Sequence, residues 1–199
     1  MKAPVFDFGG VMTTSTMPQR VKAEAAALGI PWNAVVEGFG KYRHAYDGGE
    51  ISLRELYERT WRDNDLSVSA ADTERIVEAD RASWLYRNER TLAWMRELKA
   101  QGRRIGILTN MAPDFATLFK KHFADYIELA DAMVISGYEH MFKPQRQIYD
   151  LLRTRIGLPA SDLVFFDDVE ENCQGARDAG WSAIRFVTNE QAEKDFAAL

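Results

Sequence analysis

The stretch VFDFGGV, residues 5–11, runs a short apolar segment into one aspartate, Asp7, and then into two glycines. The apolar part predicts a first β-strand over residues 3–8. In an open parallel sheet, ligands bind beyond the carboxyl ends of the strands, so a polar side chain in this place predicts a functional site. Gly9 and Gly10 would let a ligand approach the main chain closely.

Beyond residue 91, short apolar segments alternate with helical patterns. Strands are expected over residues 104–108, 132–136, 163–166 and 182–186, and helices over 91–99, 113–122, 144–155 and 170–179. Strands that alternate with helices are typical of a parallel sheet covered on both faces. The sequence therefore predicts an α/β fold with a doubly wound parallel sheet.

Residues 18–88 interrupt this alternation with helical patterns only. Apolar side chains from Trp32 to Tyr46 recur at spacings of three and four, and Asp47-Gly48-Gly49 ends that pattern. Further helices are expected over residues 51–61 and 72–85. We therefore expect a core domain of residues 1–17 and 89–199 with an inserted helical domain of residues 18–88, which suits a chain of 199 residues.

The composition narrows the class of partner. The net charge is −5, and the Lys and Arg residues are scattered, which disfavours binding to nucleic acid or to an anionic membrane. No segment is apolar enough for a membrane span, and none is typical of a secretory leader. Cys173 is the single cysteine, which suits a reducing cytoplasm. We expect a cytoplasmic protein with a small-molecule ligand, and the sequence favours no particular oligomeric state.

Polar residues gather where the predicted strands end. Thr109 and Asn110 close the stretch ILTN, Asp167 and Asp168 follow an apolar strand in FFDDVEEN, and Lys143 lies in MFKPQ before a helix. Each has an ordinary structural alternative: a turn for ILTN, a helix cap for the double aspartate, and a solvated surface lysine. Their convergence with Asp7 at one sheet edge favours a shared functional site.

These four stretches, in this order, resemble the four motifs of the haloacid dehalogenase superfamily. The helical insertion lies where that family carries its C1 cap. DFGGV, ILTN, YDGGEIS and FFDDVEEN most resemble the branch that holds the soluble epoxide hydrolase N-terminal phosphatase and bacterial glucose-1-phosphate phosphatase. The resemblance implies a Rossmann-like core and a Mg²⁺-dependent phosphatase that acts on a small phosphorylated metabolite through an aspartyl-phosphate.

The expected roles follow from the needs of phosphoryl transfer, which are a nucleophile and neutralisation of the phosphate charge. Asp7 is the candidate nucleophile, and Thr109 and Lys143 are expected to hold the phosphate. We expect the metal ligands to be Asp7, the Gly9 carbonyl and Asp168, and we expect Asp167 to hold metal-bound water. Asn110 and Asn172 are expected to orient their neighbours by hydrogen bonds. Substrate contacts are expected from Arg43, His44 and Tyr46.

Gly9 departs from the family pattern. Most phosphatases of the superfamily carry a second aspartate there as general acid and base, so this site would favour leaving groups that need little protonation, unless a water or His44 supplies the proton. Two alternatives remain open. A 2-haloacid dehalogenase would use the same aspartate without a metal, which leaves Asp167-Asp168 hard to explain. A non-catalytic phospho-ligand-binding protein on a degenerate phosphatase scaffold is the other.

Overall fold

The computed structural model describes residues 1–15 and 17–199. Five parallel strands form one sheet in the order β3-β2-β1-β4-β5. Their bounds are β1 Ala3–Phe6, β2 Gly106–Thr109, β3 Ala132–Ile135, β4 Leu163–Asp167 and β5 Ser182–Arg185. The predicted doubly wound α/β fold is confirmed. Because β1 is the central strand, the residue that follows it lies in the middle of the sheet edge.

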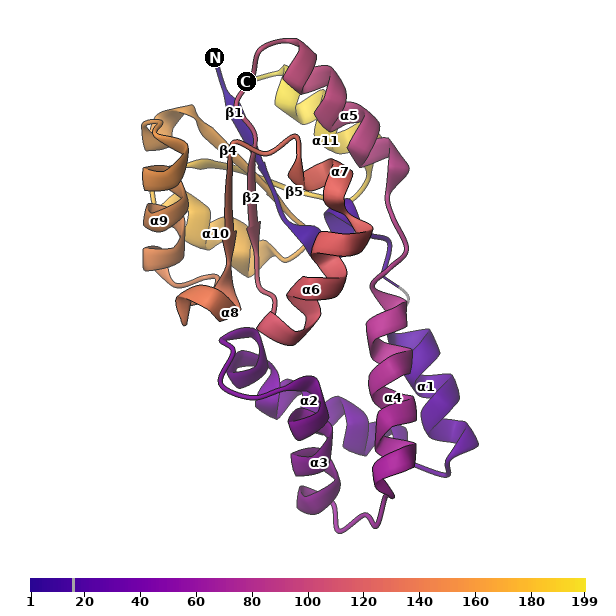
Figure 1. Ribbon diagram of the computed structural model, residues 1–199. Coiled ribbons are helices and arrows are strands. Elements are labelled where there is room, and N and C mark those ends of the chain that lie inside the picture. The colour runs from indigo at the N-terminus through magenta and orange to yellow at the C-terminus, as the bar shows by residue number, and fades with distance from the viewer. Residues whose placement is uncertain (16) are drawn as a thin grey trace.

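Alternation along each strand builds two apolar layers. Val5 packs with α9 (Arg146–Ile156) and α10 (Glu170–Asp178) on one face. Its neighbour Phe6 packs on the other face with α5 (Glu89–Ala100), α6 (Pro113–His122) and α11 (Asn189–Ala197). Side chains that follow one another in a strand point to opposite faces, so a continuous apolar run is buried on both. Figure 1 shows the sheet between these two sets of helices.

Four helices from the inserted segment lie together below the carboxyl edge of the sheet (Figure 1). They are α1 Met17–Ala27, α2 Trp32–Asp47, α3 Leu53–Asp63 and α4 Ala70–Ser83. Their inward faces share an apolar cluster built around Leu56, Tyr57, Ile76 and Val77, all fully buried. As predicted, α2 ends at Asp47, immediately before Gly48 and Gly49.

Several boundaries differ from the sequence-based expectation. Strand β1 ends at Phe6 because residues 8–12 form a short irregular helical turn, and α9 begins at Arg146 because Lys143 and Pro144 lie in the preceding loop. Helices α7 (Ala124–Ile127), α8 (Ser136–Glu139) and α11 were not predicted. Within the described part of the chain, no helix has the length and apolar character needed to cross a bilayer.

Candidate active site

Asp7 occupies the first position beyond the central strand. Its amide donates to the Phe166 carbonyl at 2.9 Å, which extends the pairing of β1 with β4 by one residue. The residue is 7% exposed, and its carboxylate lines a cavity at the sheet edge. The strand therefore fixes a nearly buried carboxylate that still reaches the cavity.

Lys143 bridges Asp7 and Asp167. Its Nζ lies 2.7 Å from Asp7 Oδ1 and 2.6 Å from Asp167 Oδ2, and the residue is 2% exposed. Asn110 holds the main chain of Lys143 on both sides: its Oδ1 accepts from the Lys143 amide at 2.8 Å, and its Nδ2 donates to the Lys143 carbonyl at 3.1 Å. The Asn110 amide therefore fixes the loop that delivers the ammonium.

Asp167 has both carboxylate oxygens fully engaged. Oδ1 accepts from the Val169 amide at 2.8 Å and from Asn172 Nδ2 at 3.1 Å, while Oδ2 accepts from Lys143 and from the same Asn172 nitrogen at 3.1 Å. A carboxylate offers about four acceptor positions, so little capacity is left for a metal ion. The geometry suits Asp167 to orienting Lys143.

Asp168 lies close to Asp7 because residue 10 is a glycine. Gly10 has φ +69°, and a Cβ added there would fall 2.5 Å from Asp168 Oδ2. One oxygen each from Asp7, Asp167 and Asp168 lie within 4.8 Å of one another. A glycine is thus needed at residue 10 for two reasons: the backbone there is left-handed, and the Asp168 side chain leaves no room for a Cβ.

The charges of this cluster are unbalanced, since three carboxylates face one ammonium. Burial raises the pKa of Asp7 to about 7 against the attraction of Lys143, and burial together with Asp167 raises the pKa of Asp168. Burial opposes the charge on Lys143, but attraction by Asp167 and Asp7 outweighs it and raises the pKa of that ammonium. A bound cation would remove this excess of negative charge, and oxygen donors suit Mg²⁺.

The cavity has a volume of about 430 Å³ and lies between the sheet edge and helices α2 and α4. Arg43, His44 and Tyr46, the candidate substrate residues, all line it. The His44 ring stacks on Phe142 with 4.8 Å between centroids. Thr109 does not line the cavity: it is the last residue of β2 and is 1% exposed, while its neighbour Asn110 does line it.

Sequence reasoning missed Trp84 and Asp80, which form another wall of this cavity. Trp84 Nε1 donates to Asp80 Oδ1 at 2.9 Å, and Tyr57 donates its hydroxyl to Asp80 Oδ2 at 2.7 Å. One signal was available, because Asp80 shares the buried face of α4 with Ile76 and Val77. A carboxylate on an apolar helix face is typically paired or functional.

The chain belongs to the haloacid dehalogenase-like hydrolase family, whose pattern matches residues 1–180. A sesquiterpene phosphatase of Aspergillus oryzae, astK, is 29% identical over 188 residues, which cover 94% of this chain and 90% of the relative. The chain is therefore a hydrolase of this family, as the sequence motifs predicted.

Solved structures share the fold. HAD family enzyme bt-2542 of Bacteroides thetaiotaomicron, solved in complex with magnesium and inorganic phosphate, has a TM-score of 0.78 at 19% identity, over 98% of this chain and 99% of that chain. L-2-haloacid dehalogenase of Xanthobacter autotrophicus, with chloropropionic acid covalently bound, has a TM-score of 0.69 at 18% identity, over 100% and 83%. The same fold therefore occurs in an enzyme that was solved with magnesium and phosphate and in a dehalogenase.

Proposed function

We propose that the protein is a Mg²⁺-dependent phosphatase that hydrolyses a small phosphorylated metabolite through an aspartyl-phosphate on Asp7. The observation that carries the proposal is the arrangement around Asp7. Lys143 engages Oδ1, and Asp168 lies beside the same carboxylate at the wall of the cavity. A carboxylate held in this way is pre-oriented for attack, and the nearby ammonium is placed to attract a phosphate.

The proposed reaction has two steps. The Asp7 carboxylate attacks phosphorus, the bond from phosphorus to the leaving oxygen breaks, and that oxygen either departs as an anion or takes a proton from water. A water molecule then attacks the phosphorus of the aspartyl-phosphate, the bond to Asp7 breaks, and the proton of the water passes to solvent. Lys143 balances charge on the phosphate oxygens throughout, and Asp167 keeps the ammonium in place.

The residues present fit Mg²⁺. Asp7 and Asp168 offer carboxylate oxygens with capacity left, and the Gly9 carbonyl would complete the protein's share. When bound, the ion supplies positive charge that stabilises the transferring phosphoryl group. Asp167 and Asn172 would support this set from behind, since Asn172 holds both oxygens of Asp167.

Helices α1–α4 are proposed to serve as a cap domain that selects the substrate. Arg43, His44 and Tyr46 reach the cavity from α2, while the groups assigned to chemistry come from the sheet edge. Thr109 and the main-chain amide of Asn110 are proposed to hold the phosphate at the end of β2, where Asn110 lines the cavity. We also place the protein in the cytoplasm, because its single cysteine, Cys173, is a buried free thiol.

The acidic cluster favours this function over a 2-haloacid dehalogenase. Metal-free attack on carbon by Asp7 does not need the two further carboxylates, Asp167 and Asp168. The negative charge of Asp168 beside Asp7 would also repel a haloacid carboxylate. A degenerate binding protein would retain phosphate affinity without turnover. Assaying p-nitrophenyl phosphate, acyl phosphates, sugar phosphates and 2-haloacids with and without Mg²⁺ separates these functions. Mg²⁺-dependent phosphate release supports the proposal, and metal-independent halide release contradicts it.

A further inference from the structure

The space beside Gly9 is filled by an aromatic ring. Trp84 Cζ3 lies 3.3 Å from the point that a Cβ on Gly9 would occupy, and Asp7 Oδ2 lies 4.0 Å from the same point. The indole and the carboxylate proposed as nucleophile therefore both border the position that a side chain at residue 9 would take. The wall at this position is apolar instead of acidic.

Trp84 is held in place from two sides. Its indole Nε1 donates to the buried Asp80, which also accepts from Tyr57. The Thr13 hydroxyl lies within hydrogen-bond distance of two carbonyls, that of Trp84 at 3.0 Å and that of Tyr86 at 2.5 Å, which ties the end of α4 to the chain that follows β1. A ring fixed by its own hydrogen bond and by its main chain makes a rigid contact surface at low entropic cost.

Apolar atoms also make up most of the exposed surface of the cavity lining as a whole. Side chains that contribute to it include Phe8, Phe39, Leu53, Met111 and Phe115, and they lie beside a larger number of polar and charged residues.

Three polar side chains on the helical side of the cavity, which also carries His44 and Tyr46, are engaged with neighbours. Arg43 Nε lies 2.5 Å from Asp47 Oδ2, Arg81 pairs with Glu78 at 3.1 Å, and both oxygens of Asp80 are used. Recruiting these groups for the hydroxyls of a polyol would break existing pairs, whereas an apolar group needs no such exchange.

We infer that Trp84 is a specificity-determining residue and that the site takes phosphate monoesters whose leaving alcohol carries an uncharged hydrocarbon group, in preference to sugar or polyol phosphates. This rests on the proposed phosphatase function for the orientation of the substrate. Asp80 is a positioning residue in this account, because it acts on the substrate only through the indole.

The test compares benzyl phosphate with glycerol phosphate, because both release a primary alcohol and their difference reports recognition more than leaving-group chemistry. The wild-type kcat/KM should favour benzyl phosphate by about tenfold or more, and Trp84→Ala should remove most of that ratio. Trp84→Phe, the matched variant, should keep much of it because it retains a flat apolar ring. Asp80→Asn, which keeps an acceptor for the indole, should preserve the ratio better than Asp80→Ala.

Binding keeps the inference testable if turnover is absent. Benzylphosphonate and a dihydroxypropylphosphonate would be titrated by calorimetry into the Mg²⁺-treated wild type, Trp84→Ala and Trp84→Phe proteins. Tighter binding of benzylphosphonate that weakens in Trp84→Ala supports the inference. Preference for the polyol compound, or a preference unchanged in Trp84→Ala, overturns it. Failure to hydrolyse even acetyl phosphate would instead refute the phosphatase proposal, while the phosphonate titration would still decide the role of Trp84.

Discussion

Lys143 Nζ lies 2.7 Å from Asp7 Oδ1, and both residues are almost fully buried. The same ammonium also contacts Asp167, so one lysine joins the central strand β1 to β4 through their carboxyl ends. A buried charge that is left without its partner is strongly destabilising. The pair is therefore expected to matter for the stability of the fold as well as for activity.

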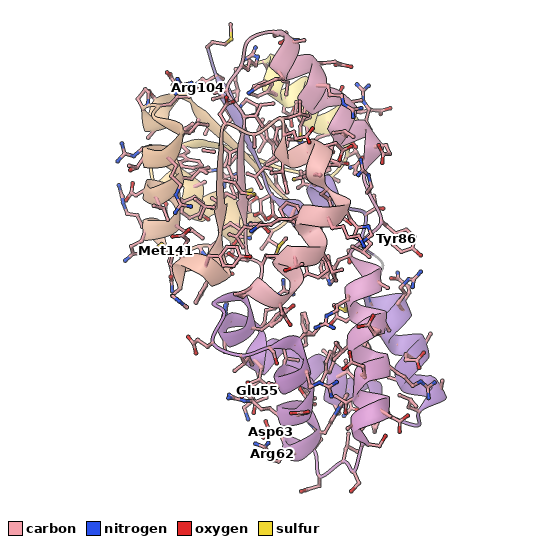
Figure 2. The ribbon with its side chains drawn as sticks, in the orientation of Figure 1. Glu55, Arg62, Asp63, Tyr86, Arg104 and Met141 are labelled. Atoms are coloured by element: carbon pink, nitrogen blue, oxygen red, sulfur yellow. The ribbon has the colours of Figure 1, made fainter. Side chains whose placement is uncertain are left out.

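Replacing Lys143 with Met should lower the free energy of unfolding by about 3–5 kcal/mol, because two buried carboxylates lose their cation. Urea denaturation monitored by circular dichroism measures the change. Lys41→Met is the matched control: Lys41 pairs with Asp63 at 2.6 Å, but on an exposed surface, and Figure 2 shows Asp63 at the end of α3 far from the sheet. The control should change stability little. Equal effects of the two substitutions would mean that Lys143 is not an essential counter-charge.

Asp168→Asn should raise the Mg²⁺ concentration needed for half-maximal activity by about tenfold or more, because one of few protein oxygen ligands is weakened. Magnesium titration of phosphate release measures it. Glu170→Gln, a nearby substitution of an exposed carboxylate that pairs with Arg177, should leave the titration unchanged. An unaltered titration in Asp168→Asn would remove Asp168 from the metal site.

Substitutions on α2 should alter substrate selectivity. Arg43→Gln and Tyr46→Phe should change the ranking of phosphorylated metabolites more than the turnover of p-nitrophenyl phosphate, because both side chains line the cavity from α2, whereas the groups proposed for chemistry belong to the sheet edge. Arg62→Gln is the control, since Figure 2 shows Arg62 at the far end of α3. Uniform losses on every substrate would assign Arg43 and Tyr46 to folding instead.

Gly9→Asp tests whether the absence of a general acid at residue 9 limits the rate with poor leaving groups. Gly9 has φ −64° and ψ 131°, which any residue adopts, and the nearest atom to an added Cβ belongs to the Trp84 ring, at 3.3 Å. The new carboxyl group should flatten the dependence of log rate on leaving-group pKa, with poor leaving groups gaining most. Adding Trp84→Leu should relieve the contact and enlarge the gain.

Gly10→Ala is the control for the substitutions at residues 9 and 84. Its Cβ would clash with Asp168, and the backbone at this position is left-handed, so the variant should be less stable and should bind Mg²⁺ more weakly. A folded, Mg²⁺-binding Gly9→Asp protein with the wild-type slope would show that a water or another residue already supplies the proton.

The sheet and the cluster of polar side chains at its edge could be predicted from sequence because the topology of a parallel sheet determines where the strand ends lie. Parallel strands bring their carboxyl ends to one edge of the sheet. Once the alternation of strands and helices has been recognised in the sequence, we therefore expect Asp7, Asn110 and Asp167 to lie close together. Helix α11 was not predicted, although Thr188 followed three residues later by Gln191 is typical of the start of a helix. The main-chain amide of Gln191 donates to Thr188 Oγ1 at 3.1 Å.

The wall opposite the sheet edge could not be predicted in the same way. Trp84 reaches Gly9 because the segment that follows α4, residues 84–88, is hydrogen-bonded to the segment after β1, a contact between segments about 75 residues apart that no local pattern encodes. The start of α9 was misplaced for a related reason. Asn110 takes up the main chain of Lys143 and keeps it in a loop, whereas Pro144 alone suggested a first helical turn.

The central claim is covalent catalysis by Asp7 in a site without a second carboxylate at residue 9. p-Nitrophenolate leaves without a proton, whereas the attacking water then lacks a general base, so the aspartyl-phosphate should form faster than it breaks down.

Rapid mixing of the Mg²⁺-treated protein with p-nitrophenyl phosphate tests this claim most directly. We expect a burst of p-nitrophenolate that approaches one per active site, with acid-quenched phosphoryl label on the peptide that carries Asp7. Asp7→Asn should show no burst and should lose turnover by roughly 10⁴-fold or more. Steady phosphate release with no burst and no label on that peptide at any quench time would contradict the account.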